Sequence, residues 1–164
     1  MKLGIVSDTH DNLELAEAAI EFFVSRGVDS VVHCGDMVAP FTAELFKREE
    51  FRFVAVRGNN DGEWKLKSTV EEFGEFYNNV AELDIEGEKL AVYHGTEEEI
   101  ADALVESGEY DYVLRGHTHE KKLRESGDTV EINPGGIELP GEDEEFHVAT
   151  LELPEGKIEF HEVE

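Results

Sequence analysis

The sequence predicts one α/β domain spanning residues 1–164, with parallel strands in its first half and antiparallel strands near its end. Three observations support this fold class. Short apolar runs alternate with segments of helical periodicity over residues 1–56, which is typical of parallel strands joined by right-handed crossovers. Two later stretches alternate apolar and polar residues around turn signals, as antiparallel hairpins do. With 164 residues, of which 40% are hydrophobic, the chain can bury a substantial core.

The elements of the first half follow from apolar spacing and from the residues at their ends. Residues 2–7 are short, apolar and rich in branched side chains, which indicates a buried strand. Residues 11–27 carry apolar side chains at helical spacing between an Asp-Asn cap and a closing glycine, which indicates a helix. The same reasoning predicts a strand at 29–33, a helix that begins with a proline at 40–49, and a strand at 51–56.

The second half begins after a polar stretch that contains Trp64, a residue that could border a substrate pocket or a dimer contact. Residues 80–95 predict two strands joined at Glu86-Gly87, followed by a helix at 97–108 and a strand at 110–114. The remaining alternating segments predict hairpins over 121–133 and 145–163, with turns at 126–128 and 154–156. We expect the two histidines of the last hairpin, His147 and His161, to be structural.

The charge of the chain excludes one class of partner. Forty acidic residues against 14 basic residues give a net charge of −26, spread along the chain among apolar positions. This acidic surface favours the cytoplasm of an extreme halophile, since the Debye length falls to about 3 Å at about 1 M ionic strength and screens the self-repulsion. An ordinary acidic protein that repels polyanions is the alternative. Both interpretations argue against binding long nucleic acids, which requires a basic stripe.

Compartment is indicated by cysteine usage and by the apolar runs. The single cysteine, Cys34, rules out an intramolecular disulfide framework and fits a reducing compartment, where we expect it to be a buried thiol. The first apolar run is too short for a signal peptide, and no stretch approaches the about 20 apolar residues of a membrane span. We therefore expect a cytoplasmic protein with no membrane partner.

Polar residues collect where five of the predicted strands end. Ligands of open α/β sheets bind beyond the carboxyl ends of the strands, so these side chains are expected to meet. In each D-x-H or H-x-H pair, an extended backbone would point both members the same way, and the adjacent glycines allow sharp exits from the strands. The residues concerned are Asp8, His10, Asp36, Asn59, His94, His117 and His119.

This set of side chains has the chemistry of a metal site. Mixed imidazole, carboxylate and amide ligands suit Mn, Fe, Ni or Zn and match poorly the all-oxygen shell of calcium. Seven ligands are too many for one zinc-like ion, which takes three or four. The sequence therefore predicts two metals that share a bridging carboxylate.

Five motifs stand in a fixed order along the chain: D-T-H at 8–10, G-D at 35–36, G-N-N-D at 58–61, His94, and G-H-T-H at 116–119. With I-N-P-G-G at 132–136, they resemble the calcineurin-like metallophosphoesterase family, and the short length resembles its small prokaryotic phosphodiesterase branch. The resemblance covers about residues 2–136. It implies a four-layer α/β/β/α sandwich with mixed sheets and the hydrolysis of small phosphodiesters. The retromer scaffold subunit has the same fold, so a non-catalytic metal-binding or scaffold protein is the alternative. A nuclease acting on long DNA or RNA fits the ligands but not the few basic residues.

The resemblance also implies how the ligands divide. One ion would take Asp8, His10 and His119, and the other would take Asn59, His94 and His117, with Asp36 bridging. Asp36, Asn59 and His94 would act in catalysis by holding the metals and the bridging hydroxide that attacks the phosphate. Manganese is the preferred metal, with nickel, iron or zinc as alternatives. Small members of the family often form dimers or tetramers, so a homodimer or a homotetramer stays open.

Further residues near the motifs have expected roles. Asn60 stands where many family members have a histidine that protonates the leaving group, and an amide has no usable proton at neutral pH. Arg57 and Arg115 precede glycine motifs and either contact substrate phosphate or pair with neighbouring acids. His33 is expected to orient a ligand or a loop, and Asp61 to hold its loop rather than bind metal.

Overall fold

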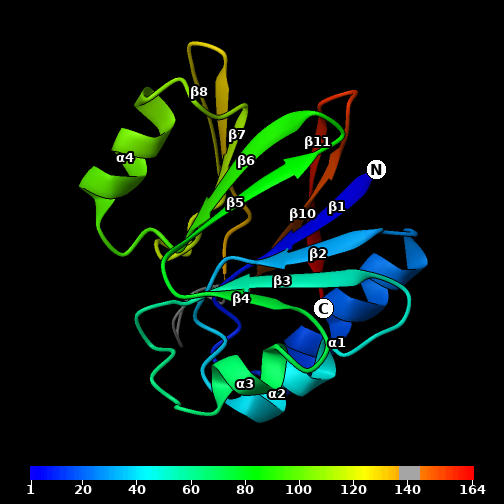
Figure 1. Ribbon diagram of the computed structural model, residues 1–164. Coiled ribbons are helices and arrows are strands. Elements are labelled where there is room, and N and C mark those ends of the chain that lie inside the picture. Colours follow the sequence, from blue (N-terminus) through cyan, green and yellow to red (C-terminus); the bar gives the residue numbers. More distant parts are fainter. Residues whose placement is uncertain (137–144) are drawn as a thin grey trace.

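The computed structural model describes residues 1–136 and 145–164 of the chain (Figure 1). In these ranges the element order is β1 (Lys2–Val6), α1 (Leu13–Ser25), β2 (Ser30–His33), α2 (Pro40–Leu45), β3 (Arg52–Val56), α3 (Leu66–Val70), β4 (Glu75–Tyr77), β5 (Val80–Ile85), β6 (Glu88–Tyr93), α4 (Glu98–Glu106), β7 (Tyr112–Leu114), β8 (Lys122–Ser126), β9 (Thr129–Asn133), β10 (Phe146–Glu152) and β11 (Lys157–Val163).

The described strands form two mixed sheets. A six-stranded sheet has the order β11-β10-β1-β2-β3-β4, in which β1 to β4 are parallel and the β10–β11 hairpin joins antiparallel beside β1. A five-stranded sheet has the order β5-β6-β7-β9-β8, in which β6, β7 and β9 are parallel and the outer strands are antiparallel. The expected parallel core and all three expected hairpins are present.

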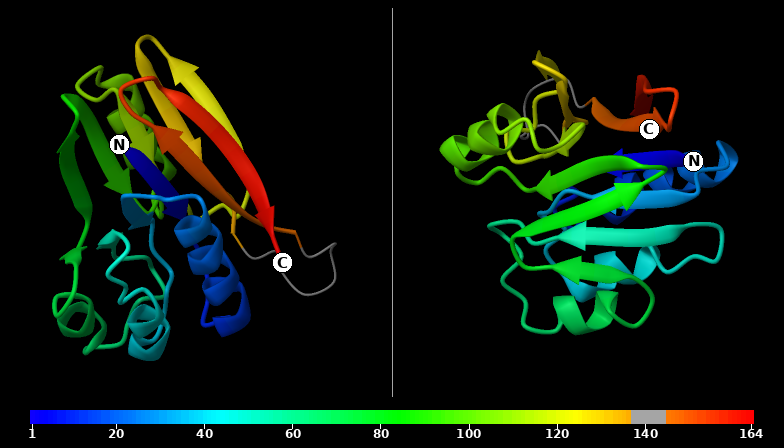
Figure 2. Two further views of the ribbon diagram at one scale, coloured as in Figure 1. Left: turned by 90° about the vertical axis from the view of Figure 1, so that its right-hand side faces the viewer. Right: turned by 45° about the horizontal axis from the view of Figure 1, so that its top comes forward.

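The sheets pack face to face and helices cover their outer faces. Helices α1 to α3 lie against the six-stranded sheet, and α4 lies on the opposite side of the molecule, against the five-stranded sheet (Figure 2, right). Separate groups of buried side chains fill the interfaces: Phe23, Phe46 and Phe53 beneath α1 to α3, Leu3, Leu90 and Leu114 between the sheets, and Ala91, Val105 and Val113 beneath α4. The order of layers is therefore α/β/β/α, as the family resemblance implied.

Two short elements were not predicted. Helix α3 and strand β4 lie in the stretch after Trp64 that reads as polar, because α3 buries only Leu66 and Val70 and β4 buries only Phe76. Helix α2 ends at Leu45, short of the predicted residue 49. Among the described helices, none combines the length and apolar character needed to cross a bilayer.

The topology brings the ends of several strands together. Strands β1, β2 and β3 are parallel neighbours and end at the same edge of the six-stranded sheet (Figure 1). Strands β6 and β7 are parallel neighbours in the other sheet, and the amide of Gly116, after β7, donates to the carbonyl of His94, after β6, at 3.0 Å. The polar motifs of both sheets follow these strand ends.

Candidate dinuclear metal centre

The ligands of the D-x-H and H-x-H pairs stand on left-handed rather than extended backbone. Asp8 and His10 have φ of 56° and 43°, and His117 and His119 have φ of 71° and 60°. The expectation that each pair points one way because its segment is extended is therefore wrong. Positive φ at a non-glycine residue is strained by about 1–3 kcal/mol, and such residues cluster at functional sites. The directions of these side chains are therefore set by sharp turns and not by the two-residue period of a strand.

Hydrogen bonds join the loop after β1 to the loop after β2 and hold Asp8 and His10 in this conformation. The amides of residues 8, 10 and 11 donate to the carbonyls of residues 35–37 at 2.9, 3.0 and 3.3 Å. His33 adds a side-chain link. Its Nδ1 accepts from the Gly35 amide at 3.2 Å, so its Nε2 carries the proton and donates to Thr9 Oγ1 at 3.1 Å. Burial lowers the pKa of His33 to about 3, so this side chain is neutral.

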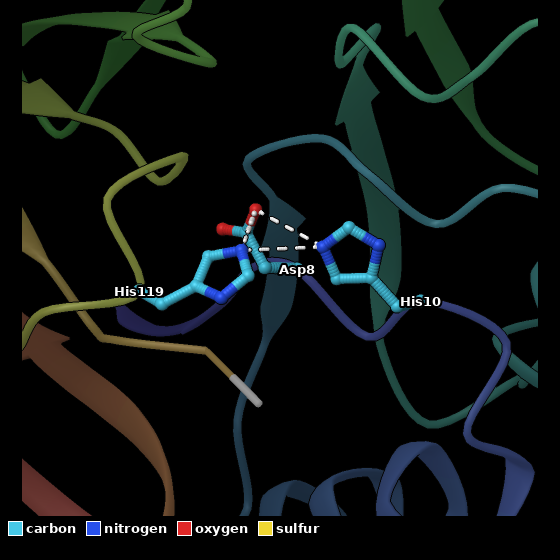
Figure 3. Close-up of side chains that lie close together, drawn as sticks. All are labelled: Asp8, His10 and His119. Carbon is cyan, nitrogen blue, oxygen red and sulfur yellow. Dashed lines mark hydrogen bonds and ion pairs between the residues drawn. The ribbon is translucent and has the colours of Figure 1, made fainter. Parts of the chain in front are cut away.

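The first cluster consists of Asp8, His10 and His119 (Figure 3). His10 Nε2 and His119 Nε2 lie 3.2 Å apart, and they are 3.7 and 3.2 Å from Asp8 Oδ1. The other carboxylate oxygen of Asp8 accepts from Ser7 Oγ and, at 3.0 Å, from the His117 amide. Burial on its own raises the pKa of Asp8, but the imidazoles of His10 and His119 outweigh it and hold that pKa well below its usual range. Asp8 is therefore a carboxylate.

The second cluster consists of Asp36, His94 and His117. His94 Nδ1 lies 2.8 Å from the Cys34 carbonyl, which can only accept, so Nδ1 is the donor. His94 Nε2 then faces Asn59 Oδ1 at 3.0 Å and Asp36 Oδ2 at 3.4 Å. The His117 ring packs edge-on against the His94 ring, with centroids 5.1 Å apart. The carbonyl of Cys34 therefore fixes which nitrogen of His94 points into the cluster.

Asp36, a member of the second cluster, also faces the first cluster. Its Oδ2 is 3.7 Å from His10 Nε2 in the first cluster and 3.4 Å from His94 Nε2 in the second. Asn60 holds both carboxylate oxygens, its amide N donating to Oδ1 at 2.8 Å and its side-chain Nδ2 donating to Oδ2 at 2.7 Å. The Asn60 side chain is thus directed at Asp36.

Asp61 fixes the backbone around Asp36. Its carboxylate accepts from the amides of Asp36, Gly58 and Val38 at 3.0, 2.6 and 2.7 Å. Burial raises the pKa of Asp61 above its usual value, although the three amides oppose that shift. Asp61 therefore ties the loop after β3 to the loop after β2.

Both clusters fit divalent metal ions. In each cluster the ligand atoms of the three residues lie within 4.8 Å of one another. In the described part of the chain, Asp8 Oδ1 is buried and accepts no hydrogen bond, although two imidazole nitrogens lie near it. In the second cluster, one imidazole nitrogen faces two oxygen acceptors. Lone pairs that converge in this way are stabilised by a cation, and the nitrogen and oxygen donor set suits borderline divalent metals.

The guanidinium groups of the two arginines contact residues other than the seven candidate ligands. Arg115 is 1% exposed, and its guanidinium pairs with Glu98 and Glu131, which is the second of the two alternatives, pairing with neighbouring acids. The neighbouring carboxylates bind the Arg115 guanidinium because a buried cation is strongly destabilising unless it is paired. Arg57 donates to the Asp61 carbonyl and stacks over Phe76 at 5.2 Å from the ring centroid. A contact between Arg57 and substrate stays a prediction.

The remaining singled-out residues lie outside the two clusters. Cys34 is fully buried in the interface between the sheets, where burial raises the pKa of its thiol. His161 lies 3.0 Å from Thr150 Oγ1 across the β10–β11 hairpin, and His147 lies 3.3 Å from Lys121 Nζ. Trp64 is 79% exposed, close in sequence to Asn60.

Sequence reasoning missed one residue that supports the site. Asn133 Nδ2 donates to the Gly116 carbonyl and to Thr118 Oγ1, both at 3.0 Å, and Asn133 Oδ1 accepts from the Gly135 amide at 3.0 Å. It thus holds the loop that carries His117 and His119. The I-N-P-G-G motif was the available signal, but the partners of this asparagine depend on the parallel pairing of β7 and β9.

Comparisons with known sequences agree with this geometry. The family model described as the calcineurin-like phosphoesterase superfamily domain matches residues 1–156. Phosphodiesterase MJ0936 of Methanocaldococcus jannaschii is 39% identical over 138 residues, which are 82% of this chain and 83% of that protein. Phosphodiesterase YfcE of Escherichia coli K12 is 28% identical over 158 residues, with 85% of this chain and 81% of that protein covered.

Solved structures extend the comparison to the fold. An archaeal phosphodiesterase has a TM-score of 0.91 and 34% identity, with 99% of both chains covered. YfcE of E. coli has a TM-score of 0.71 and 21% identity over the whole of both chains. Vps29 of Entamoeba histolytica has a TM-score of 0.66 and 17% identity, covering 99% of this chain and 98% of Vps29, and shares the fold. With its sandwich of mixed sheets and its two ligand clusters, this chain belongs to the calcineurin-like phosphoesterase superfamily.

Proposed function

We propose that this chain is a metal-dependent phosphodiesterase that hydrolyses small phosphate diesters. The observation that carries the proposal is the position of Asp36 Oδ2, which lies 3.7 Å from His10 Nε2 and 3.4 Å from His94 Nε2. A carboxylate between two ligand clusters is what a dinuclear centre requires of a bridging residue. Family membership and two relatives named phosphodiesterase support the same activity.

The proposed centre divides the ligands between two cations. Asp8, His10 and His119 hold one, and Asn59, His94 and His117 hold the other, with Asp36 shared. Two divalent cations, when bound, supply a nucleophilic hydroxide near neutral pH and neutralise charge on the phosphate oxygens. The donor set favours manganese, with nickel, iron or zinc as alternatives.

The chain's own residues hold this centre and orient it. Asn60 and Asp61 fix Asp36 through hydrogen bonds to its carboxylate and its amide. Since the Asn60 side chain donates to Asp36 and has no proton to release at neutral pH, it cannot act as a general acid. We therefore expect diesters with good leaving groups to react fastest, with water protonating poorer ones.

The acidic surface limits the substrate. Two divalent cations exceed the negative charge of Asp8 and Asp36, so the loaded centre is positive within a chain of net charge −26. This contrast attracts a small phosphate ester and repels long DNA or RNA. The same composition supports the cytoplasm of a halophile as the setting, with residues 1–164 acting as one domain. We also propose that the chain assembles as a homodimer or a homotetramer.

A non-catalytic scaffold of the same fold is the second candidate. Its support is the fold shared with Vps29, at 17% identity. A scaffold does not need its ligand residues, whereas all seven stand in this chain and six form the two clusters. The enzyme is therefore the stronger proposal.

The test is hydrolysis of bis(4-nitrophenyl) phosphate and of 4-nitrophenyl phosphate at high salt, with Mn²⁺, Ni²⁺, Zn²⁺ or a chelator. We expect metal-dependent turnover that favours the diester and is lost in Asp36→Ala. Asp128→Ala, in an exposed turn, is the matched control and should behave as wild type. Turnover that resists the chelator would contradict metal dependence, and absent turnover with every metal would favour the scaffold.

A further inference from the structure

Arg115 is a buried cation directly after strand β7. Its Nη2 lies 2.6 Å from Glu98 Oε2, and its Nη1 lies 3.0 Å from Glu98 Oε1 and 3.2 Å from Glu131 Oε1. Glu98 begins helix α4, and Glu131 lies in strand β9. The guanidinium fork therefore connects three elements of the five-stranded layer, which a point-like ammonium could not do with the same geometry.

The guanidinium also packs against the backbone next to His94. A Cβ atom on Gly95 would lie 2.8 Å from Arg115 Nε and 2.9 Å from Arg115 Nη2, so the residue at 95 must be glycine for this approach. Gly95 has φ of 98°, which glycine adopts without strain. The side chain of Arg115 is thus in close contact with the loop that carries His94.

The backbone of Arg115 leads directly to His117. The intervening Gly116 amide donates to the His94 carbonyl at 3.0 Å. Arg115 therefore lies at the junction of the two loops whose imidazoles, His94 and His117, form the second cluster. Its side chain contacts one loop and its main chain belongs to the other.

The side chains around Arg115 form a network with equal numbers of acidic and basic groups. Glu131 is fully buried and also pairs with Arg124 and Lys122, and Arg124 pairs with Asp102. Three basic and three acidic side chains make up this network: Arg115, Lys122, Arg124, Glu98, Asp102 and Glu131.

We propose that Arg115, held by Glu98 and Glu131, is a positioning residue for the His94–His117 half of the metal centre. It sets the spacing of the two loops, so that both imidazoles meet one cation. The first cluster depends on it less, because two of its three ligands, Asp8 and His10, follow β1 in the six-stranded sheet, whereas the side chain of Arg115 pairs with Glu98 and Glu131 in the five-stranded layer. The proposal rests on the proposed function, since it needs two cations to bind.

The experiment is calorimetric titration of Mn²⁺ into chelator-treated protein, with thermal unfolding by circular dichroism alongside. His10→Ala and His117→Ala identify which binding step belongs to which cluster. Arg115→Lys keeps the charge but loses the fork, and Glu98→Gln removes one carboxylate. Arg52→Lys, in the exposed Arg52–Glu75 ion pair between β3 and β4, is the matched control.

Mutation of residues that orient metal ligands typically lowers metal affinity by about 10–100-fold. We expect Arg115→Lys to weaken the step lost in His117→Ala by about that factor, with Glu98→Gln in the same direction. The step lost in His10→Ala should change by less than about threefold, and Arg52→Lys should match wild type.

The outcomes separate the two proposals. If wild type binds fewer than two cations, the proposed function fails. If wild type binds two cations and Arg115→Lys binds both as tightly, the positioning role fails alone. A lower melting temperature with unchanged affinities, or an equal loss at both steps, assigns the network a purely structural role and also overturns the inference.

Discussion

Replacing Gly58 by alanine tests how closely the bridging carboxylate is held. A Cβ atom at residue 58 would lie 2.1 Å from Asp36 Oδ1 and 2.2 Å from the Asp36 backbone N. An ordinary contact for Cβ begins near 3.4 Å, so one of the two loops must shift by more than 1 Å. Rotating the Asp36 side chain cannot relieve the contact with its backbone. The change also disturbs Asp61, because its carboxylate accepts from the backbone amides of Asp36 and Gly58 at 3.0 and 2.6 Å.

The expected loss follows from that displacement. Misplacing reacting groups by about 1 Å lowers rates by about 10²-fold, which corresponds to about 2.7 kcal/mol of transition-state stabilisation. We therefore expect kcat/KM for bis(4-nitrophenyl) phosphate with Mn²⁺ to fall by about two orders of magnitude in Gly58→Ala.

Gly62→Ala is the control for this prediction. It lies in the same loop, neither glycine has a positive φ, and a Cβ atom on Gly62 meets nothing within 4 Å. Its activity should stay within twofold, and its free energy of unfolding should change by at most about 1 kcal/mol. If Gly58→Ala keeps more than a third of wild-type kcat/KM while remaining folded, the close approach does not matter for the centre.

Three further predictions concern the leaving group, acid and salt. Asn60→His should raise kcat/KM for alkyl diesters relative to aryl diesters, because a histidine can protonate a poor leaving group; an unchanged ratio contradicts this account. The pKa of His33 is about 3 when folded and 6.5 unperturbed, so its neutral form favours folding above pH 6.5 and this contribution is lost as the pH falls toward 3. His33→Asn should therefore flatten the fall in melting temperature between pH 6.5 and 4, and parallel curves would refute it. Raising KCl from 0.1 to 1 M shortens the Debye length from about 10 to about 3 Å, so the melting temperature should rise; a flat response would argue against a halophilic chain.

Much of the fold could be predicted because burial imposes period and length on the sequence. Strand β1 and helix α1 have continuous apolar patterns, and their alternation implies parallel pairing. Helix α3 and strand β4 escaped because five-residue and three-residue elements contain too few buried positions to set a period. The seating of the β10–β11 hairpin beside β1 is a long-range pairing that no local pattern encodes.

The candidate site could be anticipated in its membership but not in its local geometry. Ligand-type residues after parallel strands must gather at one edge, which is why Asp8 and His119 meet although they are far apart in sequence. The left-handed backbone at Asp8 could not be foreseen, since local propensity disfavours it and hydrogen bonds from its loop to residues 35–37 hold it. The pairing of Arg115 with Glu131 similarly depends on β9 lying beside β7.

Each ligand cluster draws on both halves of the sandwich. Asp8 and His10 follow β1 in the larger sheet and His119 follows β7 in the smaller one, while Asp36 follows β2 and faces His94, which follows β6. An ion bound in either cluster would cross-link the two sheets at the edge where their strands end. By mass action, ion binding would then raise the free energy of unfolding by about 2.7 kcal/mol at an ion concentration of 100 times its dissociation constant. The activity of the protein and the stability of its two-sheet structure would then both depend on the supply of metal.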